Sequence, residues 1–193
     1  MATAIAYPIN YEVDPQLTGR NRLTNLVRYI LAFPQLMVVS VLGQVAQLMA
    51  VVSWFAIIVT GKQPKGLWDF MLQYMVWKAH VQGYSMLHVD PYPPFTFDPI
   101  EYPARFTAGE FTLQRDRLTT LLRLIWAIPH FIALMFIGIV WFVTVFIGWL
   151  LVVITASYPE GLYNFSVGFT RWSLRVEAYC LLMTDEYPPF SMA

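Results

Sequence analysis

The sequence has little charge, and neither sign is in excess. Only 12% of its 193 residues are charged, 12 basic side chains balance 12 acidic ones, and 58% of the residues are apolar. Soluble globular domains carry about 25% charged residues. The shortage of charge therefore indicates a membrane protein. The missing basic excess argues against nucleic acid as a partner, because phosphate neutralisation needs clustered lysine and arginine.

Groups that carry chemistry are also scarce. Cys180 is the only cysteine, so the chain cannot form an internal disulfide. No set of cysteines and histidines has the spacing of a metal site, and no pair of histidines has the spacing of a haem site. The sequence has no nucleophile beside a base and no glycine-rich phosphate loop. We therefore expect a protein that is not an enzyme and that binds neither cofactor nor metal.

Two long stretches contain no charged residue at all. They lie between Arg28 and Lys62 and between Arg123 and Glu160. As a single helix, each would reach about 50 Å, against roughly 30 Å of hydrocarbon in a bilayer. We therefore expect a break within each stretch.

Pro34 and Pro129 lie inside these stretches, and an interior proline kinks or breaks a helix. Each proline is expected to separate a kinked, amphipathic entry helix from a membrane span. The entry helices are predicted at 22–33 and 117–128, and the spans at 35–60 and 130–155.

The chain is a tandem repeat. Segment 20–28 returns as segment 115–123, an offset of 95 residues, and the same offset aligns the rest of the chain without a gap. In this alignment 28 of 89 residue pairs are identical. The repeat predicts two homologous membrane modules, 7–95 and 102–190.

Each module is predicted to be helical after a short, polar, strand-like entry at 7–13 or 102–113. The last helix of each module, 67–87 or 162–183, is long enough to cross a membrane. Charged side chains near its centre would be costly there. We therefore favour a last helix that lies in the membrane interface, with a crossing helix as the alternative. The predicted fold class is an all-α integral membrane protein of two modules.

Several motifs of the second module resemble a known family. They are Ala127-Ile-Pro-His130, Tyr158-Pro-Glu-Gly-Leu162, Arg171-Trp-Ser-Leu-Arg175-Val and Thr184-Asp-Glu-Tyr-Pro-Pro-Phe190. Together they resemble a family of small bacterial membrane proteins known only as a domain of unknown function. The resemblance spans almost the whole chain, more loosely in the first module. It implies a bacterial inner-membrane protein with duplicated modules, and it implies no activity, cofactor or catalytic residue.

Arginines repeat most regularly between the modules. Those near the entry helices, and a pair one turn apart in the last helix of the second module, are expected to contact anionic lipid head groups. These residues are Arg20, Arg22, Arg28, Arg115, Arg117, Arg123, Arg171 and Arg175. A role in membrane topology is the simpler, compatible alternative. Asp90 and Asp185 follow the last helices and are expected to accept hydrogen bonds in turns, with proton acceptance as the alternative.

Three residues in the middle of the first span predict a contact between helices. Gly43 permits close approach, and Gln44 and Gln47 carry amides that need hydrogen-bond partners in hydrocarbon. At a spacing of three, the two glutamines share a helix face. The partner is expected to be the second module, another copy or another membrane protein. A polar lining for a solute path is the alternative.

Two classes of function follow from these features. The favoured class is a non-catalytic membrane component, either an accessory subunit of a membrane complex or a self-assembling scaffold. The alternative is a transporter or channel component for a small solute or a lipid, because duplicated modules often surround a transport path. We expect a multi-pass protein of the inner (plasma) membrane, whose partners are anionic lipids, membrane protein subunits or itself.

The sequence leaves the membrane topology open. One crossing per module would invert the second module relative to the first, whereas two crossings would keep both in the same orientation. The segment Met1–Asn21 lacks a basic start followed by an apolar stretch, so no signal peptide is expected.

Overall fold

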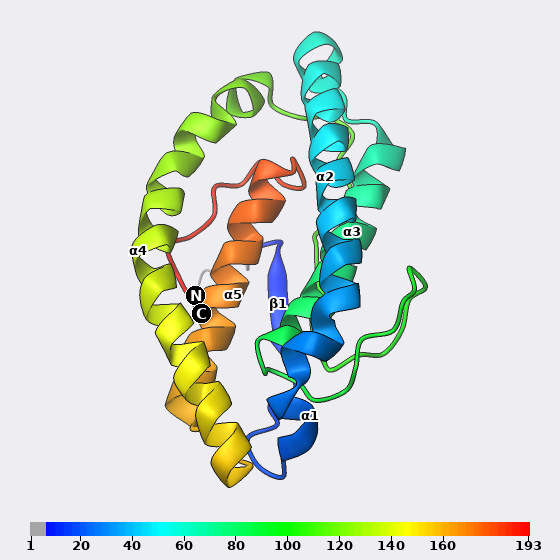
Figure 1. The fold of residues 1–193 in the computed structure, drawn as a ribbon. Coiled ribbons are helices and arrows are strands. Elements are labelled where there is room, and N and C mark those ends of the chain that lie inside the picture. Colours follow the sequence, from blue (N-terminus) through cyan, green and yellow to red (C-terminus); the bar gives the residue numbers. More distant parts are fainter. Residues whose placement is uncertain (1–6) are drawn as a thin grey trace, which may run out of the picture.

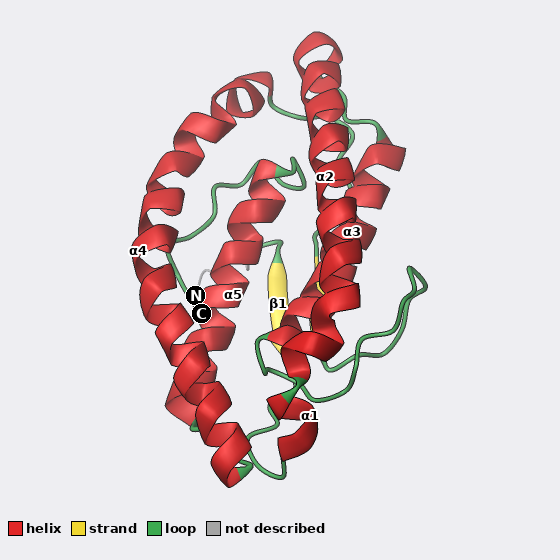
Figure 2. Cartoon of the chain, viewed as in Figure 1, coloured by secondary structure: helices red, strands yellow, loops and turns green. Residues whose placement is uncertain are grey.

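The structure, a computed structural model, describes residues 7–193 and is mostly helical. Its helices are α1 (Arg22–Leu26), α2 (Arg28–Thr60), α3 (Lys65–Ser85), α4 (Arg117–Thr155) and α5 (Glu160–Cys180), and its strands are β1 (Asn10–Val13) and β2 (Ala104–Thr107). Figure 2 shows how little of the described chain is strand. Residues 1–6, part of the segment assessed for a signal peptide, lie outside the described residues.

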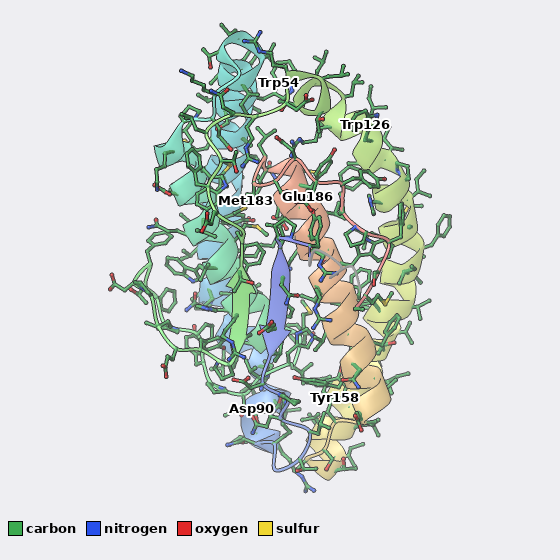
Figure 3. The ribbon with its side chains drawn as sticks, turned by 180° about the vertical axis from the view of Figure 1, so that it is seen from behind. Trp54, Asp90, Trp126, Tyr158, Met183 and Glu186 are labelled. Atoms are coloured by element: carbon green, nitrogen blue, oxygen red, sulfur yellow. The ribbon has the colours of Figure 1, made fainter. Side chains whose placement is uncertain are left out.

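The elements form three layers. α2 and α4 make one face of the molecule, α3 and α5 pack behind them, and the strands lie on the opposite face (Figures 1 and 3). Apolar side chains of the middle layer, including Met71, Met75 and Leu174, are buried in the core between the layers. The two repeats thus share one core.

The strands form an antiparallel ribbon with one apolar and one polar face. Tyr11 pairs with Phe106, and both side chains are buried against the helices. Glu12 pairs with Arg105, and both are exposed. Successive side chains of a strand point to opposite faces, which explains why these polar, alternating entry segments form strands.

The second module is inverted relative to the first. α2 and α4 run antiparallel (Figure 1), as do the two strands. Tyr11 faces Phe106, which is its own counterpart at the offset of 95 residues. A residue can face its counterpart in this way only on a two-fold axis. An approximate two-fold axis therefore passes through the centre of the ribbon.

Hydrogen bonds between the modules repeat this symmetry. The indole Nε1 of Trp54 donates to the carbonyl of Thr120 at 3.0 Å, and that of Trp149 donates to the carbonyl of Asn25 at 2.9 Å. Each bond maps onto the other at the offset of 95. The tryptophans that recur in the sequence therefore tie each long helix to the start of the other module.

The strands are exchanged between the modules. β1 of the first module packs against α5 of the second, and β2 of the second module packs against α3 of the first. The predicted modules, 7–95 and 102–190, are therefore units of sequence repetition but not separate units of packing.

The long helices are more continuous than the sequence predicted. α2 passes through Pro34 and α4 passes through Pro129. In the first module the break falls at Val27, between α1 and α2. A proline removes one backbone hydrogen bond, and the turns on either side of it keep theirs. Figure 1 shows α4 as one long, curved helix. The prediction of separate entry helices ending at the prolines was wrong.

The last helices also differ from their predicted role. α3 and α5 lie in the middle layer, with much of their length buried, rather than along an outer membrane interface. The indole of Trp77 donates to Gln35 Oε1 at 2.8 Å, and that of Trp172 lies 3.1 Å from His130 Nδ1. These tryptophans therefore hold α3 to α2 and α5 to α4.

Candidate functional site at the junction of the modules

Arg28 is the centre of a buried cluster of polar groups in the first module. Its Nη1 donates to the carbonyls of Tyr84 at 2.6 Å and Val89 at 2.7 Å, and its Nη2 lies 2.5 Å from Asp90 Oδ1. The guanidinium also lies over the Tyr84 ring, 4.5 Å from its centroid. Helix ends leave carbonyl groups without helical partners, and this arginine satisfies them at the end of α3.

Arg20 completes the cluster from outside the helix. Its Nη2 donates to the Leu87 carbonyl at 2.8 Å, and its Nε lies 2.8 Å from Asp90 Oδ1. Leu87 has a left-handed backbone conformation, with φ 60°. Burial lowers the pKa of the Arg20 guanidinium, and the Asp90 carboxylate opposes that shift. We name Arg20, Arg28 and Asp90 the first arginine clasp.

The second module contains the same arrangement. Arg123 Nη1 donates to the carbonyls of Tyr179 and Thr184, both at 2.6 Å, and its Nη2 lies 2.6 Å from Asp185 Oδ1. Arg115 donates to the Met183 carbonyl at 3.0 Å. We name Arg115, Arg123 and Asp185 the second arginine clasp. The two clasps explain why these arginines and aspartates recur at the same offset.

The clasps correct part of the lipid prediction. Arg28 is 0% exposed and Arg123 is 2% exposed, and the side chains of Arg20 and Arg115 are 0% and 5% exposed. These side chains are buried and their Nη groups bond inside the protein, so these four arginines do not face lipid head groups. The aspartates accept hydrogen bonds there, but from arginine side chains and from the backbone amides of Asn21 and Asp116 rather than from amides of their own turns.

The other four arginines differ among themselves. Arg22 and Arg117 are exposed, and for them head-group contact stays a prediction. Arg171 donates to the carbonyls of Tyr11 and Met192. Arg175 donates to those of Ile9 and Ala193. The paired arginines of α5 therefore hold the N-terminal strand and the C-terminal tail together, which corrects their predicted lipid role.

A cavity of about 450 Å³ lies between the modules, bordered by α2, α3, the start of α4 and α5. Its walls are mostly apolar, with Tyr74 and Glu177 among the lining side chains. The Tyr74 hydroxyl donates to Glu177 Oε1 at 3.0 Å, and Lys78 forms an ion pair with the same carboxylate. We name this space the ion-pair cavity.

The predicted helix-contact residues lie close to the ion-pair cavity. Gly43 and Gln47 line it, and a Cβ on Gly43 would lie 2.9 Å from the Tyr74 hydroxyl. The side chain of Gln44 is exposed. Gly43 thus permits the close approach of α3. The Gln44 side chain points away from the protein, so its neighbour is water, lipid or another protein. Their predicted role in association stays a prediction.

A second cavity, of about 380 Å³, occupies the symmetry-related position. It is lined by Tyr29, Met86, Trp141, Phe142, Val145, Phe146 and Trp149. The counterparts of Tyr74, Lys78 and Glu177 in the aligned sequence are Phe169, Ser173 and Gln82. The ion pair therefore occurs at only one of the two symmetry-related junctions between the modules.

A second polar group that lacks a symmetry-related copy surrounds His88. This imidazole is fully buried, with Nδ1 3.0 Å from the Tyr11 hydroxyl and Nε2 2.9 Å from Ser166 Oγ. Trp141 Nε1 donates to the same serine oxygen at 3.1 Å. The chain of bonds links β1, the end of α3, α5 and α4.

Sequence reasoning missed both of these one-sided groups. Their signal is visible in the repeat alignment, where His88, Ser166 and Tyr11 stand opposite Met183, Met71 and Phe106. A polar residue in one copy opposite an apolar residue in the other marks a site that has no symmetry-related copy. Within residues 7–193, no cluster of three His, Cys, Asp or Glu side chains could hold a metal ion.

The described residues define a duplicated helical protein with two inverted halves, locked by buried arginines. α2 and α4 are long and apolar enough to cross a membrane. The chain belongs to the family described as a domain of unknown function (DUF4389), which matches residues 22–96 and 117–192. The two matches begin 95 residues apart (117 − 22), which confirms the internal repeat. No curated protein and no solved structure matches the chain.

Proposed function

We propose that this protein is a non-catalytic component of the inner (plasma) membrane that acts as a scaffold, by assembling with further copies of itself or as an accessory subunit of a membrane complex. One observation carries the proposal. In the most apolar windows of α2 and α4, only 17% and 22% of the residues are buried within the protein. Water does not solvate such helices well, so lipid or protein must cover them.

The glutamines of α2 support assembly rather than lipid coverage alone. An amide in hydrocarbon has no partner unless another polar group meets it. Gln44 is exposed on α2, and Gln47 borders the ion-pair cavity at a spacing of three. A neighbouring protein that offers donors and acceptors would satisfy both side chains. We therefore propose that the protein contact includes this part of α2.

A second candidate function is the binding or transfer of a lipid or small solute. The ion-pair cavity favours it, because an apolar space with a few polar groups is typical of small-molecule sites. Tyr74, Lys78 and Glu177 would then orient the polar end of the bound molecule. Their mutual bonds also make them a self-satisfied structural group, which is why we rank this function second.

Replacement of Gln44 and Gln47 together with leucine is expected to convert the assembly to monomers without lowering the melting temperature. The measurement is the mass of the protein in mild detergent and in nanodiscs. Val41 and Val52 are exposed apolar residues of the same helix, and their joint replacement with leucine is the matched control. That control should leave the assembly intact.

Two results would contradict the scaffold proposal. The first is a wild-type protein that is a single monomer under both conditions and that co-purifies with no other membrane protein from gently solubilised membranes. The second is solute or lipid transfer by the purified chain in vesicles, with loss of transfer when Glu177 is replaced by glutamine. The second result would establish the alternative function in its place.

A further inference from the structure

The three layers of the fold differ in polarity. The outer face of the ribbon carries Asn10, Glu12, Arg105 and Thr107, and the inner face carries Tyr11, Val13, Ala104 and Phe106. Arg105 also forms two 2.7 Å contacts with Asp14, and both side chains are largely exposed. On the opposite side of the molecule, α2 and α4 expose mostly apolar side chains, with Gln44 and Gln47 of α2 among the exceptions.

The polar ribbon lies midway along the long helices. Its centre, where Tyr11 meets Phe106, is on the approximate two-fold axis that also exchanges α2 with α4. Figure 1 shows β1 beside the middle of the molecule rather than at one end. If α2 and α4 crossed a bilayer, the exposed ion pair of Asp14 and Arg105 would lie near the centre of the hydrocarbon.

The linker between the modules meets the same difficulty. Residues 91–103 have no regular secondary structure and run along the side of the molecule, as Figure 1 shows. Asp98 and Glu101 of this linker are exposed. Irregular backbone and charged side chains do not face lipid within the hydrocarbon region, because nothing there satisfies their polar groups.

The lengths of the helices lead to the same conclusion. α2 has 33 residues and α4 has 39. At 1.5 Å per residue these helices are about 50 Å and 58 Å long, whereas the hydrocarbon is about 30 Å thick. Even at the 40° upper end of the usual tilt range, a crossing helix places only about 39 Å of its length in the hydrocarbon, so about 10–20 Å of largely apolar helix would lie outside it. A helix parallel to the membrane can keep its whole apolar face in the hydrocarbon.

We infer that α2 and α4 lie along a single leaflet, parallel to the membrane plane, with their apolar outer face in the hydrocarbon and the ribbon in water. The inference rests on the proposed membrane function and names the partner of this face as the lipid of one leaflet. It replaces the expected multi-pass topology. The two-fold axis then lies along the membrane normal, so the exposed Arg22 and Arg117 are on the same side of the membrane.

The exposed aromatic residues fit this orientation. Tyr92 and Phe95 of the first Tyr-Pro-Pro-Phe segment, and Tyr187 and Phe190 of the second, are exposed. The second segment packs beside α4, where Tyr187 donates to the Trp126 carbonyl. Aromatic side chains favour the head-group boundary. Segments that flank the long helices, rather than cap their ends, would reach this boundary only if the helices lie flat.

The depth of four sites along α2 tests the orientation. Ile30, Val41, Val52 and Val59 are exposed and share a helix face opposite the buried positions. Each is replaced by cysteine in the full chain, which carries Cys180→Ser, and a spin label is attached. The protein is reconstituted into vesicles of phosphatidylcholine and phosphatidylglycerol, and label depth is measured from the relative access of oxygen and a water-soluble nickel complex.

A flat helix predicts the same depth at all four sites, about 5–10 Å below the head groups. A label at Glu12→Cys should be open to the nickel complex. A depth that is greatest at Val41 and falls toward both ends, with a shielded label at Glu12→Cys, would overturn the inference and leave the scaffold proposal intact. Labels that are all open to water on a protein that vesicles do not retain would contradict the membrane function itself.

Discussion

Replacement of Arg28 or Arg123 with methionine is expected to lower the free energy of unfolding by about 3–5 kcal/mol, which is the usual cost of breaking a buried ion pair. In each clasp the change removes one donor from each of two backbone carbonyls and from the aspartate, whose contact with Arg20 or Arg115 remains. Unsatisfied buried polar groups are costly, because their hydrogen bonds to water are also lost. The expected result is poor accumulation and a strongly lowered melting temperature in detergent.

The geometry of the clasp predicts that lysine does not replace arginine. A guanidinium is planar and carries five donors, so Arg28 reaches two carbonyls and a carboxylate at once. A lysine ammonium is a single point on a flexible chain. Arg28→Lys should therefore recover less than half of the stability that Arg28→Met loses. Arg22→Met, at the exposed start of α1, is the matched control and should change stability by less than about 0.5 kcal/mol.

Equal melting temperatures for the Arg28→Met and Arg22→Met variants would contradict the stabilising role of the clasps. It is also contradicted if the two clasps differ greatly, because their contacts are nearly the same. A double replacement of Arg28 and Arg123 is expected to prevent folding. The thermal melt can be followed through tryptophan fluorescence, since Trp54 and Trp149 hydrogen-bond across the modules beside the two clasps.

Acidification is expected to destabilise the protein through His88. Burial lowers the pKa of this imidazole to about 3, and the charges of Arg20, Arg28 and Arg171 add to the shift. An unfolded histidine has a pKa of about 6.5, so between these values the unfolded state binds more protons. The protein therefore has its full free energy of unfolding, as far as His88 is concerned, above pH 6.5. That free energy falls as the pH is lowered toward 3. At pH 5, which is 1.5 units below the pKa of an unfolded histidine, the free energy of unfolding is expected to be lower by about 2 kcal/mol.

His88→Gln isolates this contribution to the pH dependence. Glutamine can bond to Tyr11 and Ser166 but does not titrate, so the variant should lose less stability between pH 7.5 and pH 5 than the wild type does. His80, whose pKa burial lowers to about 4, is present in both proteins and its effect cancels in the comparison. Equal losses in the two proteins would show that His88 is not buried as described.

The repeat was the most informative feature of the sequence, and it predicted that the two halves have the same elements. The direction of the halves could not be predicted, because it depends on contacts between residues far apart in the chain. The bond from Trp54 to Thr120 is such a contact. A short alternating segment predicts a strand but does not identify its partner. The exchange of β1 and β2 between the modules therefore could not be predicted either.

The arginines show why the candidate site could be only partly predicted. Arg28 and Arg123 stand next to long apolar stretches, where a basic residue usually marks the membrane surface. Their actual partners are carbonyls 56 and 61 residues further along, and backbone groups carry no sequence signal. The only visible trace of the clasps was that the arginines and Asp90 and Asp185 recur at the same offset. The ion pair of Lys78 with Glu177 crosses the modules, and its only trace is that Ser173 and Gln82 stand at the aligned positions.

Fractionation of cells that produce the full chain tests the central claim, that the unburied faces of α2 and α4 place this protein in a membrane. The account predicts that the protein stays with the membranes after an alkaline carbonate wash, floats with lipid in a density gradient, and leaves the lipid only in detergent. A well-behaved protein, purified from the soluble fraction without detergent and with the melting temperature of a stable fold, would contradict it.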